Sequence, residues 1–268
     1  MIPHDYITEW RHRAPWTQDV QVEQDLIISR ALIEIFSRKL LGDNLAFRGG
    51  TALYKLYLKP VRYSEDIDLV QSKAQSIGPI LDALHEALDP WLGEPKWKQS
   101  EGRVTMVYRM RAEDDSPLKL KVEINSREHF SVFGLESRLL EMRSRWFTGS
   151  TVIPSYHLDE LMGTKMRALY QRKKGRDLFD LWFAYKDVGI DPDRVIDSFL
   201  HYIEREGHRV SRAEYEENLL KKLKSPLFIN DVRPLVTADC PWDFQEAADF
   251  VMRGLVARLP GEQWQGLT

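Results

Sequence analysis

The hydrophobic pattern of this chain changes near residue 156. Before that point, segments such as RVTMVYRM (103–110) and LKLKVEIN (118–125) alternate apolar and polar residues, which is typical of half-buried strands. After it, one segment after another repeats its apolar residues at helical spacing, beginning with LDELMGTKMRALYQRK (158–173). We therefore predict an α+β protein in which residues 1–155 mix strands and helices and residues 156–268 form a helical unit.

The composition excludes several classes of protein. Of the 268 residues, 43% are hydrophobic and 29% are charged, which indicates a globular chain and argues against disorder. The net charge of −3 gives no global basic field, so any polyanion site must be local. The single Cys240 excludes an intramolecular disulfide framework and a thiolate zinc site. Because we find neither a membrane-spanning apolar stretch nor a signal peptide, we expect a cytoplasmic protein.

The segment EDIDLV (65–70) places two aspartates inside an apolar run. Because successive side chains of a strand alternate between faces, Asp66 and Asp68 would project together, with Ile67 turned to the other side. Two neighbouring carboxylates repel each other and can bind a hard divalent cation such as Mg²⁺. A solvated turn is the alternative, but the apolar flanks favour a strand. We therefore predict that Asp66 and Asp68 bind Mg²⁺.

Gly49-Gly50-Thr51 lies between a predicted strand in LAFRGG (45–50) and a predicted helix, TALYKLYL (51–58). Glycines let a ligand approach the backbone closely, and the free N–H groups at a helix N-terminus favour an anion. The alternative is that Gly50 only permits a tight corner and that Thr51 is an N-cap. The aspartate pair shortly downstream favours a phosphate site.

Glu123 is a third candidate metal ligand. It lies on the polar side of the predicted strand LKLKVEIN, which could run beside the strand that carries Asp66 and Asp68. Three carboxylates on neighbouring strands can hold one or two Mg²⁺ ions. The alternative is a surface glutamate paired with Lys119 or Lys121.

A basic and acidic cluster follows in KMRALYQRKKGRDLFD (165–180). Lys165 and Arg172 are seven residues apart and share a helical face, and Asp177 and Asp180 share a face of the next helix. Such a cluster can neutralise a leaving pyrophosphate or bind an RNA backbone. Alternatively, Asp177 caps its helix and Asp180 pairs with Lys165 or Arg176.

In this order, the motifs resemble the AbiEii/AbiGii-type nucleotidyltransferase toxins, whose fold belongs to the polymerase β-like nucleotidyltransferase superfamily. The Gly-Gly/Ser-or-Thr motif of that family, leading into an Asp-x-Asp pair, matches Gly49, Gly50 and Thr51 followed by RYSEDID (62–68). Its acidic strand residue resembles Glu123 in KVEI, although other branches of the superfamily have Asp there.

The two remaining family motifs lie further along the chain. A lysine followed by arginine on a helix is similar to Lys165 and Arg172, and a basic residue followed by D-x-x-D is similar to KGRDLFD (174–180). The resemblance spans about half of the chain, from Leu45 to Leu181.

The resemblance implies a nucleotidyltransferase-like mixed sheet with flanking helices, followed by a helical bundle that contributes lysine, arginine and aspartate residues to the cleft. It implies Mg²⁺-dependent transfer of a nucleoside monophosphate from an NTP to an acceptor, with the 3′ end of tRNA as the expected target and a cognate antitoxin as partner. The catalytic residues that it implies are Asp66, Asp68, Glu123, Lys165 and Asp180, the first three as metal ligands. The nucleotide-binding residues are Gly49, Gly50, Thr51, Lys165, Arg172, Arg176 and Asp177.

Two other functions remain open from the sequence. The first is a different enzyme on the same scaffold, such as an antibiotic nucleotidyltransferase or a phosphotransferase. The second is a non-catalytic NTP-binding regulator that has kept the pocket.

Overall fold

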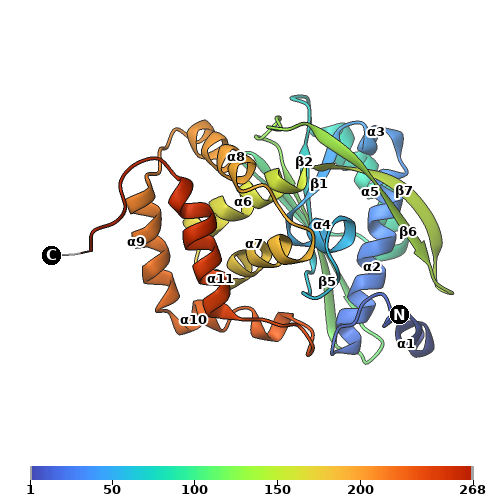
Figure 1. The fold of residues 1–268 in the computed structure, drawn as a ribbon. Helices are drawn as coiled ribbons and strands as arrows, with labels where there is room; N and C mark the ends of the chain where they lie inside the picture. Colours follow the sequence, from blue (N-terminus) through green and yellow to red (C-terminus); the bar gives the residue numbers. More distant parts are fainter. Residues whose placement is uncertain (1, 267–268) are drawn as a thin grey trace. The chain divides into compact units, whose positions relative to one another are not determined.

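The structure, a computed structural model, describes residues 2–266 (Figure 1). The chain forms two compact units, which we call unit 1 (Met1–Tyr156) and unit 2 (His157–Thr268). Among the described helices, none has the length and apolar character needed to cross a membrane.

Unit 1 is built on a mixed sheet of seven strands in the order β3-β4-β5-β2-β1-β7-β6. Two strand pairs are parallel, β2 with β5 and β1 with β7, and the other neighbours are antiparallel. The strands are β1 (Leu45–Arg48), β2 (Asp66–Gln71), β3 (Lys96–Ser100), β4 (Arg103–Arg111), β5 (Pro117–Asn125), β6 (Leu135–Arg143) and β7 (Thr148–Tyr156). This mixed α and β architecture confirms the predicted fold class.

In the described part of unit 1, residues 2–156, five helices accompany the sheet. Figure 1 shows how they are arranged. They are α1 (His4–Trp10), α2 (Asp19–Phe36), α3 (Lys39–Gly42), α4 (Gly49–Leu56) and α5 (Gly78–Leu92). Ile67 and Val122, on the apolar face of the sheet, are fully buried. Tyr108 projects from the same face, and its hydroxyl donates to Asp89 of α5 at 2.9 Å. This face therefore packs against helices, and the opposite face of β2 and β5 carries the polar residues of interest.

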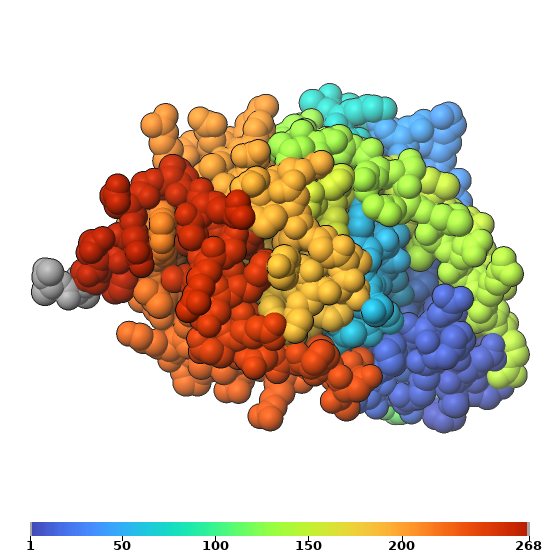
Figure 2. All heavy atoms as spheres, viewed as in Figure 1, coloured from blue at the N-terminus to red at the C-terminus, as the bar shows by residue number. Residues whose placement is uncertain are grey.

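The sequence did not predict β3, β6 or β7. The pair β6–β7 forms an antiparallel hairpin in which Leu139 lies opposite Val152. Both side chains are exposed, Leu139 by 63% and Val152 by 54%. In the space-filling view the hairpin, coloured light green, lies at the surface of unit 1 (Figure 2). A strand that exposes its apolar residues lacks the clean apolar-in, polar-out alternation on which strand prediction depends.

Unit 2 is helical, as its apolar spacing predicts. Its α-helices are α6 (Leu158–Gln171), α7 (Gly175–Asp187), α8 (Pro192–Arg205), α9 (Arg212–Leu223), α10 (Pro226–Ile229) and α11 (Phe244–Phe250). Shorter 3₁₀ or π turns occupy η1 (Arg233–Leu235), η2 (Val251–Leu255) and η3 (Val256–Arg258). Ser211 and Glu214 form a reciprocal capping box at the start of α9.

Gly163 sets how closely α6 and α8 pack. A Cβ atom at this position would lie 2.5 Å from the Oγ atom of Ser198 and 2.9 Å from the backbone nitrogen of Phe199. Both distances are shorter than van der Waals contact, so a side chain here would push the two helices apart.

We predict that Gly163→Ala lowers the free energy of unfolding by about 1–3 kcal/mol, because overpacking a tight helix contact forces the backbone to move. Gly78→Ala is the matched control, since a Cβ there would meet nothing closer than 3.7 Å. Thermal unfolding of both variants checks this. Equal melting temperatures for the two would contradict the close packing of α6 and α8.

Candidate active site

The parallel pairing of β2 with β5 brings the predicted carboxylates onto one face of the sheet. In the register of this pair, Asp66 lies opposite Lys121 and Asp68 lies opposite Glu123. Directly opposed residues on paired strands project to the same side. Asp66, Asp68 and Glu123 therefore share a face, and Lys121, which sequence reasoning considered only as an alternative partner of Glu123, lies among them.

Gly49 packs directly against the Asp68 side chain. Its φ angle is +83°, in the left-handed region that favours glycine, and an added Cβ would lie 2.1 Å from the Oδ2 atom of Asp68. Helix α4 begins at Gly49, so the N-terminus of the helix lies next to this carboxylate. The close approach leaves no space for a larger residue at position 49.

Gly50 is constrained from the other side. A Cβ atom there would lie 2.6 Å from the Nη2 atom of Arg62 and 2.8 Å from the Oγ atom of Ser64. Arg62 is 2% exposed, and its guanidinium donates to the Tyr63 carbonyl at 2.9 Å. The glycine pair therefore lies between a buried cation and a carboxylate.

Thr51 has a structural partner. Its side chain is buried, and its hydroxyl donates to the backbone carbonyl of Asp66 at 2.6 Å and lies 3.0 Å from the Oγ atom of Ser64. The alternative that Thr51 caps α4 is wrong, because the N-cap residue is Arg48. Thr51 instead joins the start of α4 to the start of β2, which fixes the glycine corner relative to the aspartates.

Lys121 lies in the candidate site, although the sequence indicated it only as an alternative partner of Glu123. Its Nζ atom lies 2.9 Å from the Oδ2 atom of Asp66 and 3.5 Å from the Oε2 atom of Glu123. Burial favours the neutral amine, but the hydrogen bond to Asp66 and the charges of Asp66, Glu123 and Asp68 raise the pKa of Lys121. The ammonium is therefore a fixed positive charge among the carboxylates. The alternation of β5, which places Lys121 and Glu123 on the same side, is the signal that could have identified it.

The three carboxylates do not form a ready-made metal cluster. Within residues 2–266, no group of three His, Cys, Asp or Glu side chains is arranged to hold a metal ion. The chemistry of the donor set nevertheless fits a hard divalent cation, because all three candidates supply carboxylate oxygens. The contact of a cationic ammonium with both Asp66 and Glu123 shows that this face accommodates a positive charge.

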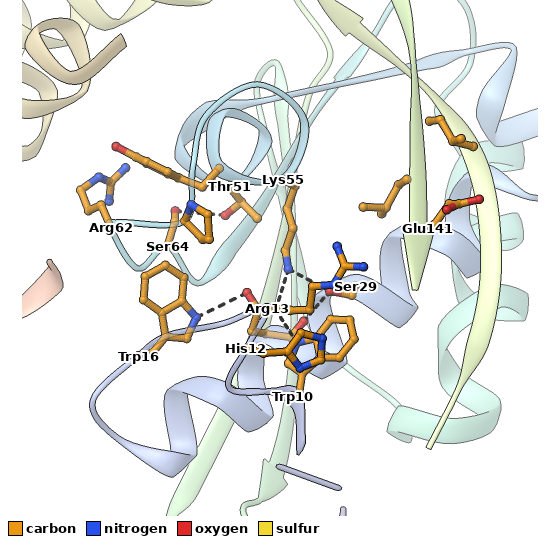
Figure 3. Close-up of a pocket in the computed structure, with 15 residues that line it drawn as sticks. Trp10, His12, Arg13, Trp16, Ser29, Thr51, Lys55, Arg62, Ser64 and Glu141 are labelled. Atoms are coloured by element: carbon orange, nitrogen blue, oxygen red, sulfur yellow. Dashed lines mark hydrogen bonds and ion pairs between the residues drawn. The ribbon is translucent and has the colours of Figure 1, made fainter. Parts of the chain in front are cut away.

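A pocket of about 510 Å³ in unit 1 shares Thr51 and Ser64 with the glycine corner (Figure 3). Within it, the Nζ atom of Lys55 donates to Asp25 at 2.7 Å and to Ser29 at 2.8 Å. The indole of Trp10 donates to the same Asp25 carboxylate at 2.9 Å. These bonds tie α1 and α2 to α4 and so hold the helix whose N-terminus forms the corner. Sequence reasoning missed this network, because its members are far apart in the chain.

In unit 2, Lys165 lies between the two predicted aspartates. Its Nζ atom is 2.8 Å from Asp180 and 3.5 Å from Asp177, and both carboxylates are fully buried. Arg172 donates to both oxygens of Asp177, each at 2.7 Å. The structure therefore brings Lys165, Arg172, Asp177 and Asp180 together in one charge network, in which Arg172 is exposed and the other three are buried. The predicted pairing of Asp180 with Lys165 is present.

Arg176 has a partner that the sequence did not indicate. Its backbone N–H and guanidinium donate three bonds of 3.0–3.1 Å to the carboxylate of Asp231. Burial of Asp231 favours the neutral acid, but the bonds and charge of Arg176 outweigh it and lower the pKa of the carboxyl group below its usual value of 3.8. Asp231 lies in a turn between α10 and η1, so no helical or strand periodicity in the sequence indicates its contact with Arg176.

Comparison with known proteins identifies the family. Residues 30–250 match the family described as the nucleotidyl transferase AbiEii toxin of type IV toxin–antitoxin systems. The chain belongs to this family. It is therefore a nucleotidyltransferase, and the resemblance drawn from its motifs is confirmed. A search of curated protein sequences finds no significant match.

Two solved structures have a similar fold. MenT4, a nucleotidyltransferase toxin from Mycobacterium tuberculosis, is 18% identical with a TM-score of 0.67, over 97% of this chain and 91% of its own. JHP933 from Helicobacter pylori is 18% identical with a TM-score of 0.57, over 89% of this chain and 92% of its own. Membership in the AbiEii family implies an NTP substrate and an antitoxin partner.

We predict that Gly49→Ala lowers the rate of nucleotidyl transfer at least about tenfold. The new methyl group would displace the Asp68 carboxylate from its position beside Asp66 and Glu123. Gly134→Ala is the control, since Gly134 has the same φ of +83° but nothing within 4 Å of an added Cβ. Steady-state transfer rates and melting temperatures of both variants check this. If both variants lost the same transfer activity, the effect would come from backbone strain alone and not from contact with Asp68.

We also predict that Asp231→Asn destabilises the protein at neutral pH and has no effect in strong acid. A depressed folded-state pKa contributes stability that is present above the unfolded value near 3.8 and is lost as the pH falls through the folded value. The difference in melting temperature between wild type and variant should therefore stay constant down to about pH 5. It should then shrink as the pH falls below 3.8 toward the folded-state pKa, as about 1–3 kcal/mol of charge-assisted hydrogen bonding disappears. A difference that stays constant below pH 3.8 would contradict the ion pair.

Proposed function

We propose that this AbiEii-family protein catalyses Mg²⁺-dependent transfer of a nucleoside monophosphate from an NTP to the 3′ end of tRNA. The observation that carries the proposal is the register of β2 and β5, which puts Asp66, Asp68 and Glu123 on one face of the sheet. The N-terminus of α4 lies beside Asp68 at the same site. Oxygen ligands and free backbone N–H groups are the two features that a metal-bound triphosphate requires.

We assign Asp66, Asp68 and Glu123 as the residues that would hold the metal. When bound, Mg²⁺ neutralises charge on the phosphate oxygens. In the absence of nucleotide, the Lys121 ammonium offsets the repulsion between Asp66 and Glu123. This role supports the assignment, because three uncompensated carboxylates on one face would oppose folding.

The glycine corner is assigned to the triphosphate. The first N–H groups of α4, at Gly49 and Gly50, have no acceptor within the helix and favour an anion. Thr51 supports this binding through its bond to the Asp66 carbonyl, which fixes the corner relative to the metal ligands. Glu123 is also the candidate general base for the acceptor hydroxyl.

The charge network of unit 2 is assigned to the leaving pyrophosphate. The Nζ atom of Lys165 lies between two buried carboxylates, and Asp180 is the closer of the two. Arg172 and Arg176 are fixed by Asp177 and Asp231, which orients their guanidinium groups before substrate binds. Fixed positive charges stabilise developing negative charge more effectively than mobile ones, because they need no reorganisation during the reaction.

We predict that Asp68→Asn abolishes nucleotidyl transfer, with a loss of at least about 10²-fold, because the isosteric amide keeps the shape and removes the charge that holds the metal. Removal of divalent metal with EDTA should abolish wild-type transfer, and Mg²⁺ should restore it. The control is Asp82→Asn, an exposed aspartate on α5, which should retain full activity. Circular dichroism confirms that both variants fold.

The assay itself separates the competing functions. Wild-type protein is incubated with tRNA, protein and aminoglycoside acceptors in parallel, using NTP labelled at the α or the γ phosphate. Transfer of only the α label to tRNA is the expected result. Transfer of the γ label would indicate a phosphotransferase, a labelled aminoglycoside would indicate an antibiotic-modifying enzyme, and binding without turnover would indicate a regulator.

A further inference from the structure

The polar face of the sheet continues beyond Glu123 toward the edge strand β3. The register places Thr105 of β4 opposite Glu123 and Lys98 of β3 opposite Thr105. Together with Asp68 these residues form one row across four neighbouring strands. Since strands lie about 4.8 Å apart, the row runs about 14 Å from the candidate metal ligand to the sheet edge.

This continuation is strongly basic. On β3, β4 and β5 the positions of the same face carry seven cations and a single acidic residue, Glu123. The cations are Lys96, Lys98, Arg103, Arg109, Arg111, Lys119 and Lys121. We call the first six of these the basic sheet face, because Lys121 belongs to the carboxylate cluster. A protein with a net charge of −3 therefore concentrates positive charge beside its candidate active site.

Most of these cations are available to a ligand. Lys96, Lys98, Arg109 and Lys119 are exposed, and none of the four forms an ion pair with another described residue. Arg103 approaches Glu123 only at 4.0 Å. Unpaired cations aligned on a sheet repel one another, which is unfavourable for folding and is relieved by a polyanion. Charge complementarity thus specifies the partner as a chain of phosphates.

We propose that the basic sheet face binds the phosphodiester backbone of the RNA acceptor and guides its 3′ end toward Asp66, Asp68 and Glu123. This inference rests on the proposed function, in which RNA is the acceptor. Phosphate contacts of this kind set the position of the RNA on the protein and carry no sequence information. The residues of the basic sheet face are therefore positioning residues and not catalytic ones.

The test compares two double variants that remove one lysine and one arginine each. Lys98→Gln with Arg109→Gln removes two cations of the basic sheet face. Lys73→Gln with Arg143→Gln is the control, because both residues are exposed and lie outside that face. Transfer kinetics are measured with purified tRNA and labelled NTP. Binding to the same tRNA is measured without NTP at several salt concentrations.

We expect the basic-face variant to raise the KM for tRNA at least about tenfold while the KM for NTP stays unchanged. The slope of log K against log salt should become shallower by about 1.4–1.8, since each lost phosphate contact contributes about 0.7 on a single strand and about 0.9 on a duplex. The control variant should match wild type in both measurements. A purely structural role of Lys98 and Arg109 would alter melting temperature and both KM values together.

Two outcomes would overturn the proposal. The first is that wild type and the basic-face variant have the same RNA affinity and the same salt slope. The second is that the control variant loses as much RNA affinity as the basic-face variant. The binding measurement needs no catalysis. If wild type transfers nucleotide to no RNA, that result counts against the proposed function, and the binding measurement still tests the basic sheet face. A third outcome would overturn this proposal and the proposed function together: weak RNA binding by wild type and both double variants, with labelling of a protein acceptor.

Discussion

The parallel pairing of β2 with β5 is the constraint on which the candidate active site depends. Its register places Asp66 directly opposite Lys121 and Asp68 directly opposite Glu123. A shift of one position would turn Glu123 to the buried face and bring Val122 or Ile124 to the polar one, because side chains alternate along a strand. Burial of the apolar residues therefore specifies the register, and the register assembles the polar site.

Lys121 and Gly49 offset two costs of this arrangement, which are repulsion between the carboxylates and crowding around Asp68. Carboxylates held on one face repel each other, and the Lys121 ammonium provides the compensating charge through its contacts with Asp66 and Glu123. The Asp68 carboxylate also needs space beside the start of α4, and glycine at position 49 is the residue that leaves it. Before any substrate binds, Lys121 thus reduces the repulsion among the carboxylates, and Gly49 leaves room for Asp68.

The sequence predicted those parts of the protein that depend on local periodicity. The two-residue alternation of LKLKVEIN placed Glu123 on the polar face, and the helical spacing after residue 157 predicted the α-helices of unit 2. It could not predict which strands pair, so the contact of Lys121 with Asp66 was missed. Asp231 was missed for a related reason, because a long-range ion pair leaves no spacing pattern in the chain.

The two edges of the sheet differ in how they meet solvent. Strand β3 presents Lys96 and Lys98, and like charges discourage another strand from adding to that edge. Strand β6 lies at the opposite edge and exposes Leu135 and Leu139. A charged residue in place of Leu139 would remove exposed apolar surface from the β6 edge and is a starting point for improving the solubility of the purified protein.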